Sequence, residues 1–231
     1  MECLSHIDPI IIYHGTFLVL FNKLMFVFLD HLDKNRNRNK QILEGLKGHN
    51  YKRDASKIGT ELGGRHGTLS ETNSNIYLLL DNKQILIKSD WIWPLTEFRH
   101  IIAHTDCVNI DKELIGRCAT ALEHIKIVWD TDEINKLMEV IYGIMDFLVI
   151  SRTKYVNISG SISEIKKINP LLIPYSLRVQ IKKDENIINA TYLKNNGGGT
   201  YFHSFDGTEK CYPNKSTFVE LLVDEKIINN K

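Results

Sequence analysis

Cysteine is scarce in this chain, and its spacing excludes two classes of small protein. The four cysteines stand far apart, at Cys3, Cys107, Cys118 and Cys211. No two of them form a Cys-x-x-Cys pair, so neither a zinc ribbon nor a disulfide framework is predicted. Isolated cysteines of this kind are typical of reduced thiols, and we expect a cytoplasmic protein.

The chain also lacks an excess of charge of one sign. It has 29 Lys and Arg residues against 28 Asp and Glu residues, which gives a formal net charge of +1. Such a balance provides no overall field to gather nucleic acid, so any RNA contact depends on a local patch. A protein whose main role is to coat RNA or DNA is therefore disfavoured, whereas an enzyme that cuts RNA is not.

No apolar run is long enough to predict a membrane span. The most apolar stretch, residues 16–29, is interrupted by Asn22 and Lys23 and is shorter than the roughly 20 residues that a bilayer requires. The N-terminus also lacks the basic, apolar and small-residue regions of a secretory signal. We therefore expect no membrane contact and interpret this stretch as part of a core helix.

The apolar residues that are present predict a mainly α protein with a helical bundle over residues 1–151. Their three- and four-residue spacing indicates a central helix over 14–33. Further helices are expected over 39–48, 52–62, 94–104, 111–128 and 132–151. A β-hairpin insertion is expected at about 76–88, where two apolar runs flank Asp-Asn-Lys-Gln.

Local signals place the ends of three of these helices. Pro94 suits the first turn of the helix over 94–104. Asp111 is a candidate N-cap for the next helix, and Asp130 or Thr131 for the one after it.

The pattern changes after residue 152 and predicts a small C-terminal α+β unit over 152–231. Residues 157–163 are polar and typical of turns. Strands are expected over 177–181, 187–193 and 200–205. Ser216 is a candidate N-cap for a last helix that runs to about Asp224.

Residues 34–40, Lys-Asn-Arg-Asn-Arg-Asn-Lys, form a short basic segment between two predicted helices. Two interpretations are open. A charge run of this kind is usually a solvated turn. Alternatively, Arg36, Arg38 and Lys40 contact RNA phosphates, and these three are the candidate RNA-binding residues.

The main functional signal lies in residues 98–105, Phe-Arg-His-Ile-Ile-Ala-His-Thr. Cleavage of an RNA phosphodiester without a metal needs a base, an acid and a cation. Histidine suits the first two roles because its pKa lies near working pH. Arginine suits the third because its planar guanidinium binds two phosphate oxygens. Arg99, His100 and His104 are therefore the candidate catalytic residues.

This segment resembles the signature of the HEPN superfamily. In that signature an arginine is followed by a polar residue, then three residues, then a histidine. Here the polar position is His100, and Ile-Ala-His completes the pattern at His104. The order of the predicted helices is also similar to the HEPN fold over about residues 14–151, whereas the hairpin and the C-terminal unit lie outside the pattern.

The resemblance implies a metal-independent endoribonuclease without a cofactor, whose product ends in a 2′,3′-cyclic phosphate. Arg99 would hold the scissile phosphate, His104 would act as acid or base, and His100 would orient or assist. Families of this kind often act in antiphage defence or as toxins, and commonly dimerise with two motifs in one cleft. We therefore expect an RNA substrate and a homodimer, with an antitoxin or a defence-system protein as a further partner.

Other interpretations stay open on the sequence alone. One is a noncatalytic HEPN-like module for dimerisation or for nucleotide or RNA binding, and another is an unrelated helical adaptor. Arg99 could pair with Glu97 or Asp106 on the surface. His100 and His104 could ligate zinc together with Asp106, or His104 could be a core histidine.

Helix geometry adds a structural requirement to the nuclease interpretation. In an ideal helix, Arg99 and His104 point about 140° apart. They converge only if the helix ends or distorts between them, or if a dimer brings two copies together. A second pair, Arg117 and His124, lies on one face in the middle of a predicted helix, and we interpret it as structural.

Overall fold

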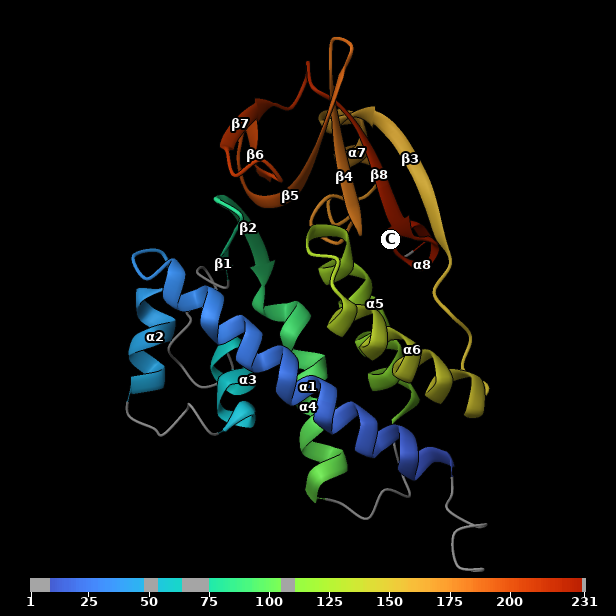
Figure 1. The fold of residues 1–231 in the computed structure, drawn as a ribbon. Coiled ribbons are helices and arrows are strands. Elements are labelled where there is room, and N and C mark those ends of the chain that lie inside the picture. The colour runs from blue at the N-terminus through green and yellow to red at the C-terminus, as the bar shows by residue number, and fades with distance from the viewer. Residues whose placement is uncertain (1–8, 48–53, 64–74, 105–110, 230–231) are drawn as a thin grey trace, which may run out of the picture. The chain divides into compact units, whose positions relative to one another are not determined.

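The structure is a computed structural model, and it describes residues 9–47, 54–63, 75–104 and 111–229 (Figure 1). Internal packing divides the chain into two compact units. Unit 1 contains residues 1–79 and 87–152, and unit 2 contains residues 80–86 and 153–231.

The helices of unit 1 are α1 (Pro9–Lys34), α2 (Lys40–Lys47), α3 (Ala55–Gly63), α4 (Ser89–His104), α5 (Lys112–Val128) and α6 (Asp132–Phe147). The hairpin strands β1 (Asn75–Leu80) and β2 (Lys83–Lys88) lie between α3 and α4 in the chain. Unit 2 continues with β3 (Tyr155–Ser161), α7 (Ile162–Ile168), β4 (Arg178–Lys183), β5 (Asn186–Asn196), β6 (Gly199–Ser204), β7 (Glu209–Pro213), β8 (Phe218–Asp224) and α8 (Glu225–Asn229).

The fold class is α+β, which corrects the mainly α class predicted from the sequence. Of the described residues, 52% are helical and about 27% lie in strands. Six strands form one antiparallel sheet in the order β3-β8-β4-β5-β6-β7. The sheet is larger than predicted because β3 and β8 fall where the sequence predicts a polar turn and a helix, and β7 falls where no element was predicted.

The strand β8 shows why that helix prediction is wrong. Its buried residues alternate along the chain at Val219, Leu221 and Val223, the period of a strand. It pairs with β3 on one side and β4 on the other. Both partners lie far away in the sequence, so pairing rather than local preference decides the conformation of this apolar run.

Helix α1 is the central helix of the bundle, as its apolar spacing predicts. It packs against α3, α4 and α6 (Figure 1). Phe17, Phe21 and Phe28 are fully buried, and the ring of Phe17 lies 4.7 Å from that of Phe98 in α4. Among the described helices, α1 is also the one apolar and long enough to cross a membrane, a property that core helices share.

Three of the predicted local features are confirmed. Asp111 caps α5 by accepting a hydrogen bond from the Glu113 backbone N–H, and Thr131 caps α6 in the same way. The hairpin turns at Asp81 and Asn82, whose positive φ angles of 46° and 64° are typical of a type I′ turn.

Helix α4 is longer than predicted. It begins at Ser89, so Pro94 lies inside the helix rather than in its first turn. The loss of one backbone hydrogen bond near the start of α4 is tolerated because the rest of the helix is packed between α3 and α5. From there α4 continues without a break to His104.

Glycines bring α3 unusually close to α4. A Cβ atom added at Gly59 would lie 2.7 Å from Thr96 Oγ1 and 2.8 Å from Phe21 Cζ. One added at Gly63 would lie 2.8 Å from Trp93 Cε3. Real Cβ atoms do not approach other atoms this closely, so the contact between the two helices requires glycine at both positions.

We expect Gly59→Ala to lower the free energy of unfolding by about 1–3 kcal/mol, because the added methyl overpacks this contact. Gly116→Ala in α5 is the matched control, since a Cβ there meets nothing within 4 Å. The control should be neutral or stabilise by up to about 1 kcal/mol, because alanine favours a helix over glycine. Urea unfolding followed by circular dichroism measures both, and equal effects would contradict the close contact.

Lys88, at the end of β2, is a partly buried cation. Burial lowers the pKa of its amine from 10.5 to about 8, while the nearby Asp90 acts in the opposite direction. Between these two pKa values the unfolded chain binds the proton more tightly than the folded chain. The contribution of this group to stability is therefore unfavourable below pH 8 and improves as the pH rises to 10.5.

Lys88→Met should accordingly raise the free energy of unfolding by about 1–3 kcal/mol at pH 7, and the gain should shrink towards pH 10. Lys83→Met, at an exposed position of the same hairpin, serves as the control and should change little at either pH. Urea unfolding at the two pH values measures the gain. A gain at Lys88 that does not depend on pH would show that charge burial is not its cause.

Candidate functional site

The three candidate catalytic residues lie on the last turns of α4. Its neighbouring residues fix how the helix sits in unit 1. Phe98 packs on Phe17 of α1, whereas Glu97 forms an ion pair with Arg117 of α5 at 2.5 Å. Because α4 is a regular helix from Ser89 to His104, no distortion brings Arg99 and His104 together. Helix geometry keeps the two side chains about 140° apart.

His100 and His104, in contrast, lie side by side. Their rings stack with centroids 6.1 Å apart and an interplanar angle of 21°. His100 is half-buried, and its Nε2 lies 3.5 Å from both Ser56 Oγ and Thr60 Oγ1 of α3. His104 is exposed to solvent, so the interpretation of a core histidine does not fit it.

Arg99 is half-buried, and its guanidinium pairs with no acidic side chain in the part of the chain that the structure describes. Its Nε is buried without a hydrogen-bond acceptor among those residues. Glu97, one of the two predicted acidic partners, pairs with Arg117 instead. The other, Asp106, lies outside the described residues. The guanidinium is thus not paired with Glu97, the predicted partner that the structure describes.

The described residues do not provide a complete set of zinc ligands around His100 and His104. Within residues 9–47, 54–63, 75–104 and 111–229, no three His, Cys, Asp or Glu side chains come together as a metal site. The third ligand that this interpretation needs, Asp106, lies outside those ranges.

The rival pair, Arg117 and His124, is held by structural contacts. The Arg117 guanidinium is engaged by Glu97. His124 is buried, stacks on the Trp91 ring at 5.0 Å and donates from Nδ1 to the Thr120 carbonyl at 2.8 Å. These contacts agree with the structural interpretation of this pair.

The basic segment forms an ordered turn between α1 and α2. Most of its charges have local partners: Lys34 pairs with Asp30 at 2.7 Å, Arg36 with Asp33 at 3.2 Å and Lys40 with Glu44 at 3.9 Å. The Arg38 guanidinium lies 4.8 Å above the Tyr77 ring. Such exposed pairs are weak, so phosphate could compete for these cations.

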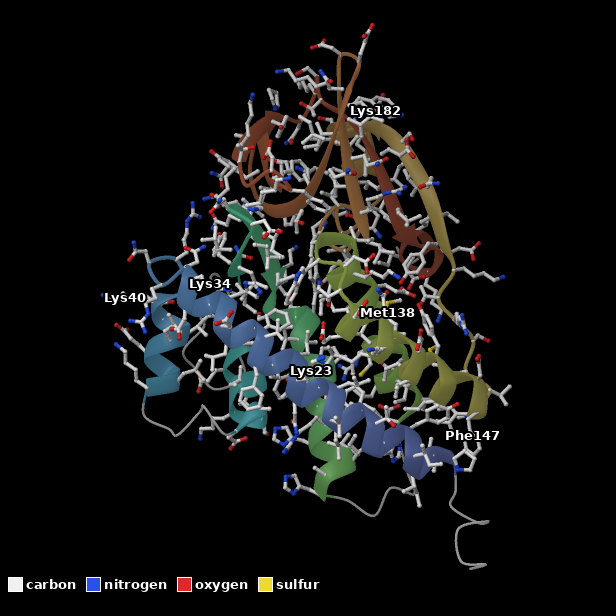
Figure 2. All side chains as sticks on the ribbon, viewed as in Figure 1. Lys23, Lys34, Lys40, Met138, Phe147 and Lys182 are labelled. Atoms are coloured by element: carbon white, nitrogen blue, oxygen red, sulfur yellow. The ribbon has the colours of Figure 1, made fainter. Side chains whose placement is uncertain are left out.

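The segment lies far from the candidate catalytic residues. His14 and Phe17 of α1 contact Phe98, whereas the basic segment begins at Lys34, the last residue of α1 and about 20 residues further along it. At 1.5 Å per residue, this separation is about 30 Å. Figure 2 shows Lys34 and Lys40 at the C-terminal end of α1, beyond Lys23. The structure therefore does not bring Arg36, Arg38 and Lys40 to the catalytic candidates.

Three residues that organise these regions were not predicted from the sequence. Asn39 is buried in the basic segment, where its Nδ2 donates to the Tyr77 carbonyl at 2.6 Å and its Oδ1 accepts from the Tyr77 N–H at 3.0 Å. Ser56 and Thr60 are the other two. The three- and four-residue spacing of Ser56, Gly59 and Gly63 is a signal of close helix packing that could have identified the α3 surface.

Asn39→Ala should lower the free energy of unfolding by about 2–3 kcal/mol, because it leaves the partly buried Tyr77 backbone groups without two hydrogen bonds. Asn37→Ala, at an exposed position of the same turn, should change it by less than about 0.5 kcal/mol. Chemical unfolding measures both variants. A neutral Asn39→Ala would contradict the role of this side chain in fixing the turn.

Comparison with known proteins adds no independent support for the resemblance. No model of a protein family matches the chain, and neither the curated proteins nor the solved structures contain a match to it. The relation to the HEPN superfamily therefore stays a hypothesis that rests on residues 98–105 and on the order of the helices in unit 1.

Proposed function

We propose that this protein is a metal-independent endoribonuclease of the HEPN type that acts as a homodimer. The observation that carries the proposal is the exposure and the pairing of three side chains on α4. His104 is exposed and stacked on His100, and the Arg99 guanidinium has no acidic partner among the described residues. An accessible imidazole and an uncommitted guanidinium are the groups that this chemistry needs.

In the proposed reaction, the ribose 2′-oxygen attacks the adjacent phosphorus and the bond to the 5′-oxygen breaks. The His104 imidazole accepts the 2′-hydroxyl proton, and the imidazolium that forms then gives a proton to the leaving 5′-oxygen. The products are a 2′,3′-cyclic phosphate and a 5′-hydroxyl, and no water is consumed. Arg99 would stabilise the negative charge of the phosphorane, and His104 would transfer a proton.

The helix geometry supports the dimer in this proposal. A regular α4 directs Arg99 and His104 of one copy about 140° apart, so one copy does not place both on the same phosphate. A twofold axis beside α4 would set Arg99 of one copy opposite His104 of the other. Each dimer would then contain two shared sites.

Other parts of the proposal rest on the sequence alone, through its cysteines or through the resemblance. These are the cytoplasmic location, the role as a toxin or defence effector, and an antitoxin or defence-system partner. Arg36, Arg38 and Lys40 would contact RNA phosphates roughly 30 Å along α1 from its contact with Phe98, a distance that a folded RNA spans.

The test is cleavage of structured RNAs in the presence of a chelator, with detection of 2′,3′-cyclic phosphate ends. We expect His104→Ala and Arg99→Ala each to lower the rate by about 100-fold or more. Arg117→Ala is the matched control from the rival pair, and it should leave the rate unchanged because it removes only an exposed ion pair.

Two results would contradict the proposal. One is the absence of cleavage by the folded wild-type dimer across a set of structured RNAs. The other is a His104→Ala variant that cleaves as fast as the wild type.

A further inference from the structure

Two hydroxyl groups of α3 face the same nitrogen of His100. Ser56 and Thr60 are one helical turn apart, so they lie on one face of α3. Their oxygens are each 3.5 Å from His100 Nε2. Both distances are at the long end for a hydrogen bond, as expected when one N–H is shared between two acceptors.

The hydrogen bonds of Thr60 indicate which group is the donor. Its hydroxyl donates to the Ser56 carbonyl at 2.9 Å, so the hydroxyl proton is already used. Thr60 Oγ1 therefore faces His100 Nε2 with its lone pairs and acts as an acceptor. The Thr60 contact is therefore a hydrogen bond only when the hydrogen of the imidazole is on Nε2.

The position of these hydroxyls is fixed by the backbone of α3. Gly59, next to Thr60 in the chain, allows α3 to approach Thr96 and Phe21, as described above. Ser56 is buried and Thr60 is half-buried, so neither side chain moves freely. The His100 ring is thus held from the α3 side, while the exposed His104 ring lies nearly parallel to it, with the ring centroids 6.1 Å apart.

The geometry points to Ser56 and Thr60 as residues that hold His100 in its Nε2–H form, and to His100 as a positioning residue for His104. In this arrangement, His104 transfers the proton, and His100 sets the orientation of the His104 ring. The role in catalysis rests on the proposed nuclease function, whereas the assignment of the hydrogen to Nε2 does not.

Substitutions at His100 separate positioning from proton transfer. A glutamine carries a donor nitrogen at about the position of Nε2 but does not titrate, so it keeps the contact with α3 and loses the acid–base chemistry. We expect His100→Gln to retain RNA cleavage within about fivefold of the wild type, and His100→Ala to lose about 50-fold or more.

Substitutions on α3 test the same contact from the other side. Thr60→Val removes the acceptor with little change in volume, and it should lower kcat about tenfold with KM nearly unchanged. Thr60→Ser keeps the hydroxyl and should cleave RNA at about the wild-type rate. If Thr60→Val is too unstable to assay, Ser56→Ala provides the same comparison.

A measurement without RNA tests the inference independently of catalysis. Long-range 15N–1H NMR spectra of the histidine rings report which nitrogen carries the hydrogen. Wild-type His100 should show the Nε2–H form, and Thr60→Val should make the Nδ1–H form detectable as well.

The outcomes distinguish the two proposals. If the wild type cleaves no RNA but NMR shows the Nε2–H form and its dependence on Thr60, the nuclease proposal fails and the α3 contact stands. A wild-type His100 in the Nδ1–H form overturns the inference. So does a His100→Gln variant as inactive as His100→Ala, because His100 itself would then transfer the proton.

Discussion

Close packing between α3 and α4 is the constraint on which the candidate site depends. Gly59 and Gly63 lie where any larger residue would collide with Thr96, Phe21 or Trp93. This packing brings the hydroxyls of α3 to His100, and His100 in turn lies against His104. A chain of contacts thus runs from backbone glycines, through two hydroxyls and a half-buried ring, to the exposed imidazole that we propose as the proton carrier.

The continuity of α4 is the second constraint, and it limits how the site can be completed. A regular helix separates Arg99 from His104 around its circumference, so these two side chains of one copy point in different directions. The sequence leaves two ways of bringing the two residues together, a break or distortion of the helix and a dimer. The helix is neither broken nor distorted between them. The dimer is therefore the arrangement that the nuclease proposal requires.

Patterns within a short segment of the sequence correctly predicted one long helix and the N-caps of two others. The spacing of apolar residues identified α1, and single side chains identified the N-caps Asp111 and Thr131. The start of α4 was predicted wrongly from Pro94. Proline favours the first turn of a helix, but it is tolerated deeper in a helix that packing supports. The strand β8 was beyond local analysis, since its partners β3 and β4 come from distant parts of the chain.

The same distinction applies to the site. Arg99, His100 and His104 were identifiable because they form a short motif in one segment. Ser56 and Thr60 lie about 40 residues earlier, and only folding brings them to His100. The pairing of Glu97 with Arg117 of α5 is likewise a contact between two helices that no spacing within residues 98–105 indicates.

The most direct test of a shared site is to mix two inactive variants. Arg99→Ala and His104→Ala are purified separately, combined in equal amounts, and allowed to exchange subunits. If each site takes Arg99 from one copy and His104 from the other, half of the dimers are mixed and each has one intact site. We predict recovery of about a quarter of wild-type RNA cleavage. No recovery, in a mixture shown to contain the mixed dimer, would contradict it.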